Sequence, residues 1–180
     1  MTGQLIAVVG PSGAGKDTVL DAICAARPTF RRVRRVITRP SSAGGEAFDG
    51  VTRAEFARRA AMGEFALSWE AHGLSYGIPA DQLRAVDEGI TLLFNGSRGM
   101  MEEARAAFPH LKVLLITARD EVLAQRLAER GRESASEISE RLSRARMSAP
   151  TGAHVIEIDN SGALDQAVAA ALAALEPVRG

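Results

Sequence analysis

The segment Gly10–Lys16, with the sequence GPSGAGK, stands between a short apolar run and the start of an amphipathic stretch. Glycines at a turn from strand to helix let successive backbone N–H groups converge on an anion, and the helix N-terminus adds a favourable dipole. A lysine at the end of such a turn reaches the outer phosphates of a nucleotide. The sequence therefore predicts a phosphate-binding loop for ATP, with Lys16 as a catalytic residue, formed by Gly10, Pro11, Ser12, Gly13, Ala14, Gly15 and Lys16.

The position after the lysine departs from the usual pattern, in which a serine or threonine hydroxyl coordinates Mg²⁺. Asp17 stands there and Thr18 follows it, and we expect both at the nucleotide site. An acidic metal partner is expected at the end of the apolar run 90–94, but Asn95 ends that run. Asp17 either supplies the metal-facing carboxylate that this run lacks or only stabilises the first helical turn through the helix dipole. Both interpretations stay open, and Asp17 is the candidate metal ligand.

Composition excludes several classes of protein. Lysine plus arginine equals aspartate plus glutamate at 22 residues each, so there is no overall basic field and we expect no nucleic-acid partner. No apolar run approaches the roughly 18 residues of a membrane-spanning helix, so we expect no membrane segment. Cys24 is the only cysteine, which favours a reducing, cytoplasmic compartment. The length of 180 residues predicts one domain, residues 1–180.

Short apolar runs alternate with helical patterns along the chain. We expect strands at residues 5–9, around Val33–Ile37, and at 65–69, 90–94, 113–116 and 155–158. We expect helices at residues 16–26, 54–62, 99–108, 120–130, 137–147 and 164–175. This alternation predicts an α/β fold, the three-layer sandwich of P-loop NTPases with a parallel sheet of about five strands. Irregular segments in such a fold usually carry function, so we expect an acceptor-binding insertion at residues 38–79 and a lid at residues 126–141.

Five arginines crowd the second strand and the loop after it: Arg31, Arg32, Arg34, Arg35 and Arg39. A strand with alternating faces cannot send all of them to one site. Arg39, at the strand end, is the best candidate for an acceptor phosphate, and we expect the others on the solvated surface. The irregular patch at residues 65–77 adds Tyr76, whose hydroxyl can reach a phosphate, whereas we expect Trp69 in the core.

The segment after the buried run 90–94 is a further candidate for the acceptor site, with Asn95, Ser97 and Arg98. Ligands of open α/β sheets bind beyond the carboxyl ends of the strands. Lid arginines neutralise charge during phosphoryl transfer, and we expect this of Arg126, Arg130 and Arg141. The alternative is a helical hairpin joined by salt bridges, since glutamates are interspersed here, and we expect that role for Arg144 and Arg146.

The GPSGAGK loop, the ITR turn at 37–39, SWEAHGLSYG at 68–77 and RLAERGRE at 126–133 occur in one order. In these segments, and over nearly its whole length, the chain resembles the guanylate-kinase-like branch of nucleoside monophosphate kinases. It is most similar to the ribose 1,5-bisphosphate phosphokinases of phosphonate breakdown, in GKD, ITRPSSAGGE, ALSWEAHGLSYGIP, FNGSR and RLAERGRESASEISERL. The resemblance implies that ATP, with Mg²⁺, phosphorylates ribose 1,5-bisphosphate to 5-phosphoribosyl diphosphate (PRPP), releasing ADP.

Two departures from true guanylate kinases concern the acceptor. Those enzymes read guanine with a glutamate just before the tryptophan and hold phosphate with a second arginine; Ser68 and Ser42 stand in those places. Losing such partners costs several orders of magnitude in discrimination. We therefore expect Ser42, Ser68 and Asn95 to suit a small phosphosugar instead. Asn160 is a candidate for the adenine side.

The sequence leaves open the identity of the acceptor, the presence of catalytic activity and the oligomeric state. The acceptor could instead be that of guanylate kinase or of another small-acceptor kinase. The chain could also be a non-catalytic guanylate-kinase-like binding module, although such modules tend to lose the phosphate loop. The oligomeric state is not fixed by the sequence, and a homodimer is left open.

Overall fold

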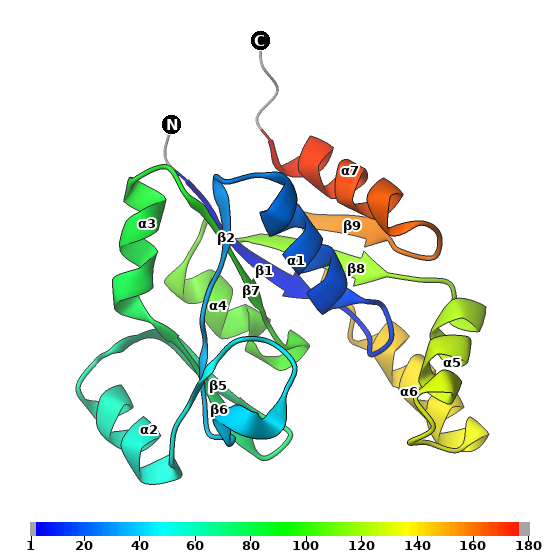
Figure 1. Cartoon of the computed structure of the whole chain (residues 1–180), viewed down its shortest axis with the longest axis horizontal. Helices are drawn as coiled ribbons and strands as arrows, with labels where there is room; N and C mark the ends of the chain where they lie inside the picture. Colours follow the sequence, from blue (N-terminus) through cyan, green and yellow to red (C-terminus); the bar gives the residue numbers. More distant parts are fainter. Residues whose placement is uncertain (1–2, 177–180) are drawn as a thin grey trace.

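The computed structural model describes residues 3–176, and its centre is a five-stranded parallel sheet (Figure 1). The strands are β1 (Leu5–Val9), β2 (Phe30–Arg32), β7 (Thr91–Asn95), β8 (Lys112–Thr117) and β9 (Val155–Asp159). Their order across the sheet is β2-β7-β1-β8-β9, so β1 is central, with β7 and β8 on either side. Every pairing in this sheet is parallel. The predicted α/β fold with a parallel sheet of about five strands is confirmed.

The two faces of the central strand bury different partners, because successive residues of a strand point to opposite faces. Ile6 and Val8 pack with helices within residues 16–26, 120–147 and 164–175, whereas Ala7 and Val9 pack with a helix at residues 101–107 and with a second sheet within residues 36–79. This gives the predicted three layers. The helices are α1 (Lys16–Ala26), α2 (Arg53–Ala61), α3 (Arg84–Asp87), α4 (Met101–Ala107), α5 (Asp120–Glu129), α6 (Ala135–Met147) and α7 (Leu164–Leu175). Single 3₁₀ turns lie at Ser41–Ala43, Ala80–Leu83 and Arg98–Met100.

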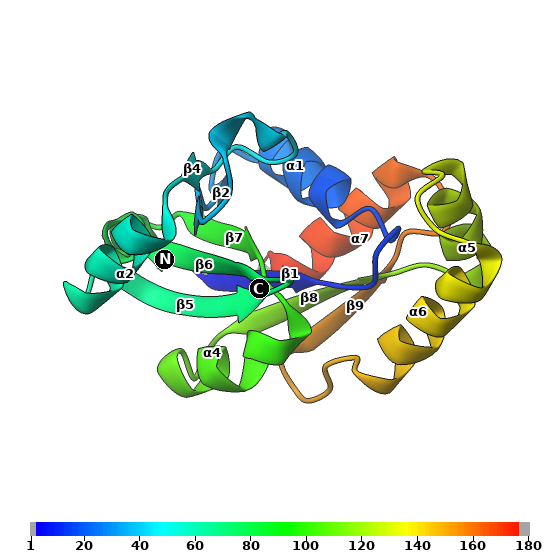
Figure 2. The same cartoon turned by 90° about the horizontal axis from the view of Figure 1, so that it is seen from below.

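A second, four-stranded sheet corrects the prediction for residues 33–79. Its strands are β3 (Val36–Ile37), β4 (Asp49–Gly50), β5 (Phe65–Ala71) and β6 (Leu74–Pro79), in the order β4-β3-β6-β5. The single strand expected around Val33–Ile37 is wrong: the chain leaves the parallel sheet after β2 and enters the second sheet at β3. Figure 2 shows this sheet and the α5–α6 hairpin at opposite ends of the molecule.

The expectation that residues 72–77 are irregular is also wrong, because β6 pairs antiparallel with β5. Ala71 pairs with Leu74, so the two-residue turn between them is His72-Gly73, and both have positive φ, 52° and 74°. Turns of this kind match the right-handed twist of antiparallel strands. The alternation of Leu74, Tyr76 and Ile78 is the period of a strand, and it was the signal for β6 in the sequence.

No helix among residues 3–176 is long and apolar enough to span a bilayer.

The boundaries of the predicted helices agree closely with those in the structure, and α6 begins with a capping box. Ser134 accepts from the Glu137 N–H, and the Glu137 carboxylate accepts from the Ser134 N–H. Such caps satisfy backbone donors that the first turn of a helix leaves unpaired.

Cys24, on α1, provides a test of the packing of this helix. Burial, with a smaller contribution from Asp21, raises the pKa of its thiol to about 11. Only the thiolate is alkylated, so at pH 8 its reactive fraction is roughly 100-fold below that of an ordinary thiol. We expect iodoacetamide to modify the folded chain about 100-fold more slowly than the chain in denaturant, as measured by mass spectrometry. Equal rates would contradict this packing.

Candidate active site

The loop between β1 and α1 has the backbone geometry of an anion cradle. Gly10 and Gly15 have φ of 155° and 84°. A Cβ at Gly10 would lie 2.1 Å from the Ile116 carbonyl oxygen, and one at Gly15 would lie 2.7 Å from Asn160 Nδ2. The loop is thus pressed against the ends of β8 and β9, and only glycine fits these two places. The backbone N–H groups at the start of α1 remain available for an anion.

Lys16 folds back over this loop. Its Nζ donates to the carbonyl oxygens of Gly10 at 2.8 Å and of Pro11 at 3.2 Å. Burial lowers the pKa of Lys16, Asp17 opposes that shift, and the charges of Arg98 and Arg130 add to it. The ammonium therefore lies in a cationic neighbourhood, which suits a group that contacts phosphate oxygens.

Arg126 and Asn160 hold the loop from the other side. Asn160 Nδ2 donates to the Ala14 carbonyl at 2.8 Å. Arg126 Nη1 donates to the Gly13 carbonyl at 3.1 Å, and Nη2 donates to the Asn160 carbonyl at 2.8 Å. The structure thus brings Arg126, expected in the lid, together with Asn160 at the donor end of the site.

Asp17 connects the phosphate loop to two other elements. Its Oδ1 accepts from Arg32 Nη2 and, at 2.5 Å, from Asn95 Nδ2, whereas Oδ2 accepts nothing from the residues that the structure describes. Burial alone would raise the pKa of Asp17, but the hydrogen bond and charge of Arg32, with Asn95, hold that pKa below its ordinary value. Asp17 is therefore an ionised carboxylate with one free oxygen beside the phosphate loop.

Asp17 and its surroundings fit a Mg²⁺ ion that is held mainly by the phosphates of a nucleotide. Residues 3–176 contain no group of three or more histidine, cysteine, aspartate or glutamate side chains that could hold a metal. Mg²⁺ usually keeps several waters and binds through one or two carboxylates plus substrate phosphates. The free oxygen of Asp17, whose side chain is 60% exposed, meets that requirement.

The predicted acceptor residues of the insertion lie on four different segments and on both faces of the second sheet. Arg39 Nη2 donates to the Gly44 carbonyl at 3.1 Å, and its guanidinium lies 4.4 Å from the Phe48 ring centre. Tyr76 stacks on the buried Trp69 with ring centres 5.4 Å apart, so Trp69 is in the core as expected. Ser68 pairs with Gly77 and lies on the opposite face of β5 from Trp69. The exposed Ser42 lies in the 3₁₀ turn 41–43.

Residues after β7 divide between the site and the hairpin. Asn95 is buried at the end of β7, beside Asp17. Ser97, partly buried, precedes the 3₁₀ turn that begins at Arg98. Arg98 Nη1 donates to the Ala145 carbonyl at 2.8 Å and to Ser148 Oγ at 2.6 Å, so it joins this strand end to the end of α6.

Ion pairs cross the α5–α6 hairpin. Arg141 pairs with Glu133 at 2.8 Å, and Arg146 pairs with Asp120. Arg144 lies 3.8 Å from Glu140. Arg130, at the end of α5, is exposed and has no ion-pair partner within residues 3–176. Arg146 therefore joins α6 to α5 and Arg141 joins α6 to the turn before it, whereas the Arg144 pair lies within α6.

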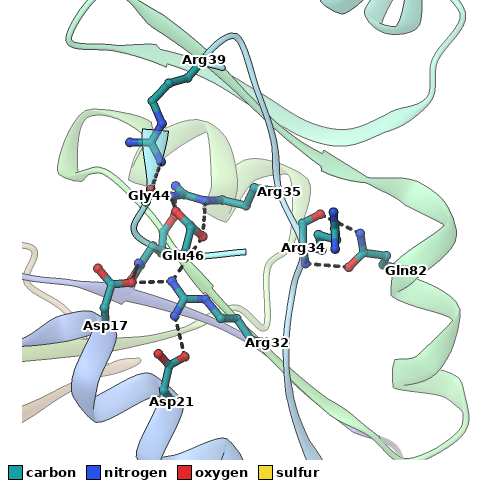
Figure 3. A network of polar contacts seen from close by, with 10 residues as sticks. Asp17, Asp21, Arg32, Arg34, Arg35, Arg39, Gly44, Glu46 and Gln82 are labelled. Atoms are coloured by element: carbon teal, nitrogen blue, oxygen red, sulfur yellow. Dashed lines mark hydrogen bonds and ion pairs between the residues drawn. The ribbon is translucent and has the colours of Figure 1, made fainter. Parts of the chain in front are cut away.

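Two residues near this site were missed from the sequence. The expectation that Arg32 and Arg35 lie on the solvated surface is wrong: their side chains are only 15% and 10% exposed. Both bind Glu46, whose side chain is 6% exposed (Figure 3). The one signal was that Glu46 is the only acid in residues 38–48 and follows the five arginines of residues 31–39.

Comparisons with known proteins found similar chains in both sequence and fold. The sequence profile of the guanylate kinase family matches residues 2–176. The chain is similar to "Ribose 1,5-bisphosphate phosphokinase PhnN" of Ruegeria sp. (strain TM1040), 48% identical over 98% of this chain and 94% of the relative. It is also 48% identical to the protein of that name from Agrobacterium fabrum, over 91% of each chain. The crystal structure of guanylate kinase from Anaplasma phagocytophilum superposes with a TM-score of 0.69 at 18% identity, covering 98% of this chain and 88% of that one.

Proposed function

The chain belongs to the guanylate kinase family, and we propose that it is a ribose 1,5-bisphosphate phosphokinase. It transfers the terminal phosphoryl group of ATP to ribose 1,5-bisphosphate and releases ADP and PRPP. The observation that carries this proposal is that Asp17, at the start of α1, bonds to Asn95 and Arg32. The donor loop is thereby joined to the acceptor side. The names of the full-length relatives supply the acceptor.

The donor and the acceptor are held by separate groups in this proposal. The amides of the phosphate loop and Lys16 bind the donor phosphates, and Arg126 and Asn160 hold that loop in shape. Mg²⁺, when bound with ATP, would offset charge on the outer phosphates, and Asp17 is the residue that would hold it. The nucleophile is a phosphate oxygen that is already ionised, so the residues need to position it and neutralise charge rather than remove a proton.

The acceptor lies between the end of β7 and the second sheet. We propose that the insertion at residues 38–79 binds it within a single domain through Arg39 and Tyr76, together with Asn95 and Arg98 at the end of β7. The lid at residues 126–141 closes over the transferring group and brings Arg130 and Arg141 to it. Closure requires Arg141 to exchange Glu133 for a phosphoryl oxygen. The cofactors are ATP and Mg²⁺, the partner is a small phosphosugar, and the compartment is the cytoplasm.

A coupled assay of ADP release tests the acceptor. We expect turnover with ribose 1,5-bisphosphate and a kcat/KM for GMP that is lower by a factor of about 10³ or more. The reason is that Ser68 replaces the glutamate that recognises guanine in related enzymes. The product is identified as a diphosphate ester by ³¹P NMR. Turnover of GMP alone would refute the proposed acceptor. No turnover of either compound by a folded chain would favour a binding module.

A further inference from the structure

Unpaired polar atoms occur on three residues that lie on the acceptor side of this proposal. Four buried side-chain nitrogen or oxygen atoms lack a hydrogen-bond partner within residues 3–176, and three of them are Arg32 Nε, Arg39 Nε and Asn95 Oδ1. The orientation of the Asn95 amide is fixed, because its Nδ2 must face the acceptor-only Asp17 carboxylate. Buried polar atoms are nearly always paired. Two unpaired donors and one unpaired acceptor are complementary to phosphate oxygens and a hydroxyl group.

A buried ion pair between Arg35 and Glu46 contacts two of these three residues, Arg32 and Asn95. Glu46 Oε1 accepts from Arg35 Nη2, and Oε2 accepts from Arg35 Nε and from Arg32 Nη2, both at 3.2 Å. Both carboxylate oxygens are thus used, and Glu46 holds two guanidinium groups at once (Figure 3). A fork of this kind fixes the plane of the Arg35 guanidinium as well as its position.

Arg35 retains hydrogen-bonding capacity after this pairing. Its Nη1 donates to the Asn95 carbonyl at 2.7 Å, so three of its five N–H groups are used and two remain. Its guanidinium lies 4.9 Å from the Tyr76 ring centre and 5.9 Å from that of Trp69. Burial lowers the pKa of Arg35 to about 10, so it still carries its charge at neutral pH. Arg35 is therefore a fixed cation between the donor loop and the second sheet.

We propose that Arg35 is an acceptor-binding residue, which donates to phosphate oxygens of the acceptor, and that Glu46 is a positioning residue. Glu46 holds Arg35 and Arg32 in the orientation that the acceptor requires. The same guanidinium lies over the Trp69 and Tyr76 rings, so a phosphate that it binds is held beside the second sheet. This inference rests on the proposed function and adds to it a residue that the sequence had placed on the surface.

The test compares single and paired replacements of this ion pair. R35M should raise KM for ribose 1,5-bisphosphate about 10- to 100-fold, because the acceptor loses charge-assisted hydrogen bonds. KM for ATP should change less than about twofold. E46Q leaves Arg35 buried without its charged partner, so we expect a marked fall in thermal stability. The double variant R35M/E46Q removes both charges and should regain stability. R34M is the matched control, because Arg34 forms an exposed pair with Asp49 at 2.6 Å.

The double variant separates binding from structure. If Arg35 binds the acceptor, R35M/E46Q regains the melting temperature but keeps the raised acceptor KM. Recovery of both would show that the pair is only structural and would overturn the inference. An equal rise in KM for ATP, or the same effect from R34M, would also overturn it. If the wild-type chain does not turn over ribose 1,5-bisphosphate, the proposed function and this inference fail together, whereas an unchanged acceptor KM in an active R35M enzyme refutes the inference alone.

Discussion

Replacing Lys16 with alanine is expected to lower kcat by roughly 10²–10³-fold, the usual cost of removing one charged group from a developing transition state. The Lys16 ammonium is bound only to the carbonyls of Gly10 and Pro11 among the described residues, so it is available for phosphate oxygens when ATP enters. The melting temperature of Lys16→Ala should instead rise. Because burial lowers the pKa of Lys16, the folded state disfavours its charged form at neutral pH, and removing the group removes that cost.

The measurements are kcat from ADP release and the melting temperature at pH 7. Lys112 is the only other lysine and lies at the start of β8, so Lys112→Ala is the matched control and should retain turnover. Loss of activity together with a large drop in the melting temperature would indicate a structural role for Lys16. Retention of full turnover by Lys16→Ala would refute the phosphate loop as the donor site.

The phosphate loop and the parallel sheet were predictable because their signals are local. GPSGAGK between the apolar run 5–9 and a helical pattern specifies strand, turn and helix within about 20 residues. Alternation of such units then requires a parallel sheet. The second sheet was missed because β3 and β4 have two residues each and show no periodicity. The strand expected at 65–69 is β5 of this sheet, and β6 left a further usable pattern in Leu74, Tyr76 and Ile78.

The acceptor side was less predictable because it depends on contacts between distant residues. Arg35 is 60 positions from Asn95, and it becomes buried because the chain crosses from one sheet to the other at this point. In the sequence it is one of five similar arginines, and an alternating strand argues for exposure of most of them. The structure instead places Arg34 at the surface and buries Arg35 beside Asn95. Arg35 precedes β3 and Glu46 lies in the loop before β4, so neither segment of the sequence by itself predicts that the two side chains pair.

Replacing Asp17 with asparagine is expected to have a second large effect. The experiment decides whether Asp17 holds Mg²⁺ or only stabilises the first turn of α1. If Asp17 holds Mg²⁺, we expect kcat/KM to fall about 100-fold and the Mg²⁺ concentration for half-maximal rate to rise about tenfold or more. Asparagine keeps an oxygen that can accept from Arg32 and Asn95, so the network loses charge but not shape. A role limited to the helix dipole is worth only about 0.3–1 kcal/mol and would leave the Mg²⁺ dependence unchanged.

Asp21 provides the control for this experiment. It lies one helical turn further along α1 and pairs with the same guanidinium, at 2.6 Å from Arg32 Nη1. Asp21→Asn therefore removes an equal charge from Arg32 without touching the phosphate loop. A second readout is the rise in melting temperature on adding ATP with Mg²⁺, compared with ATP and a chelator; the difference should shrink in Asp17→Asn and persist in Asp21→Asn. Equal behaviour of the two variants would mean that Asp17 acts through Arg32 alone, and that Mg²⁺ depends on the nucleotide rather than on this carboxylate.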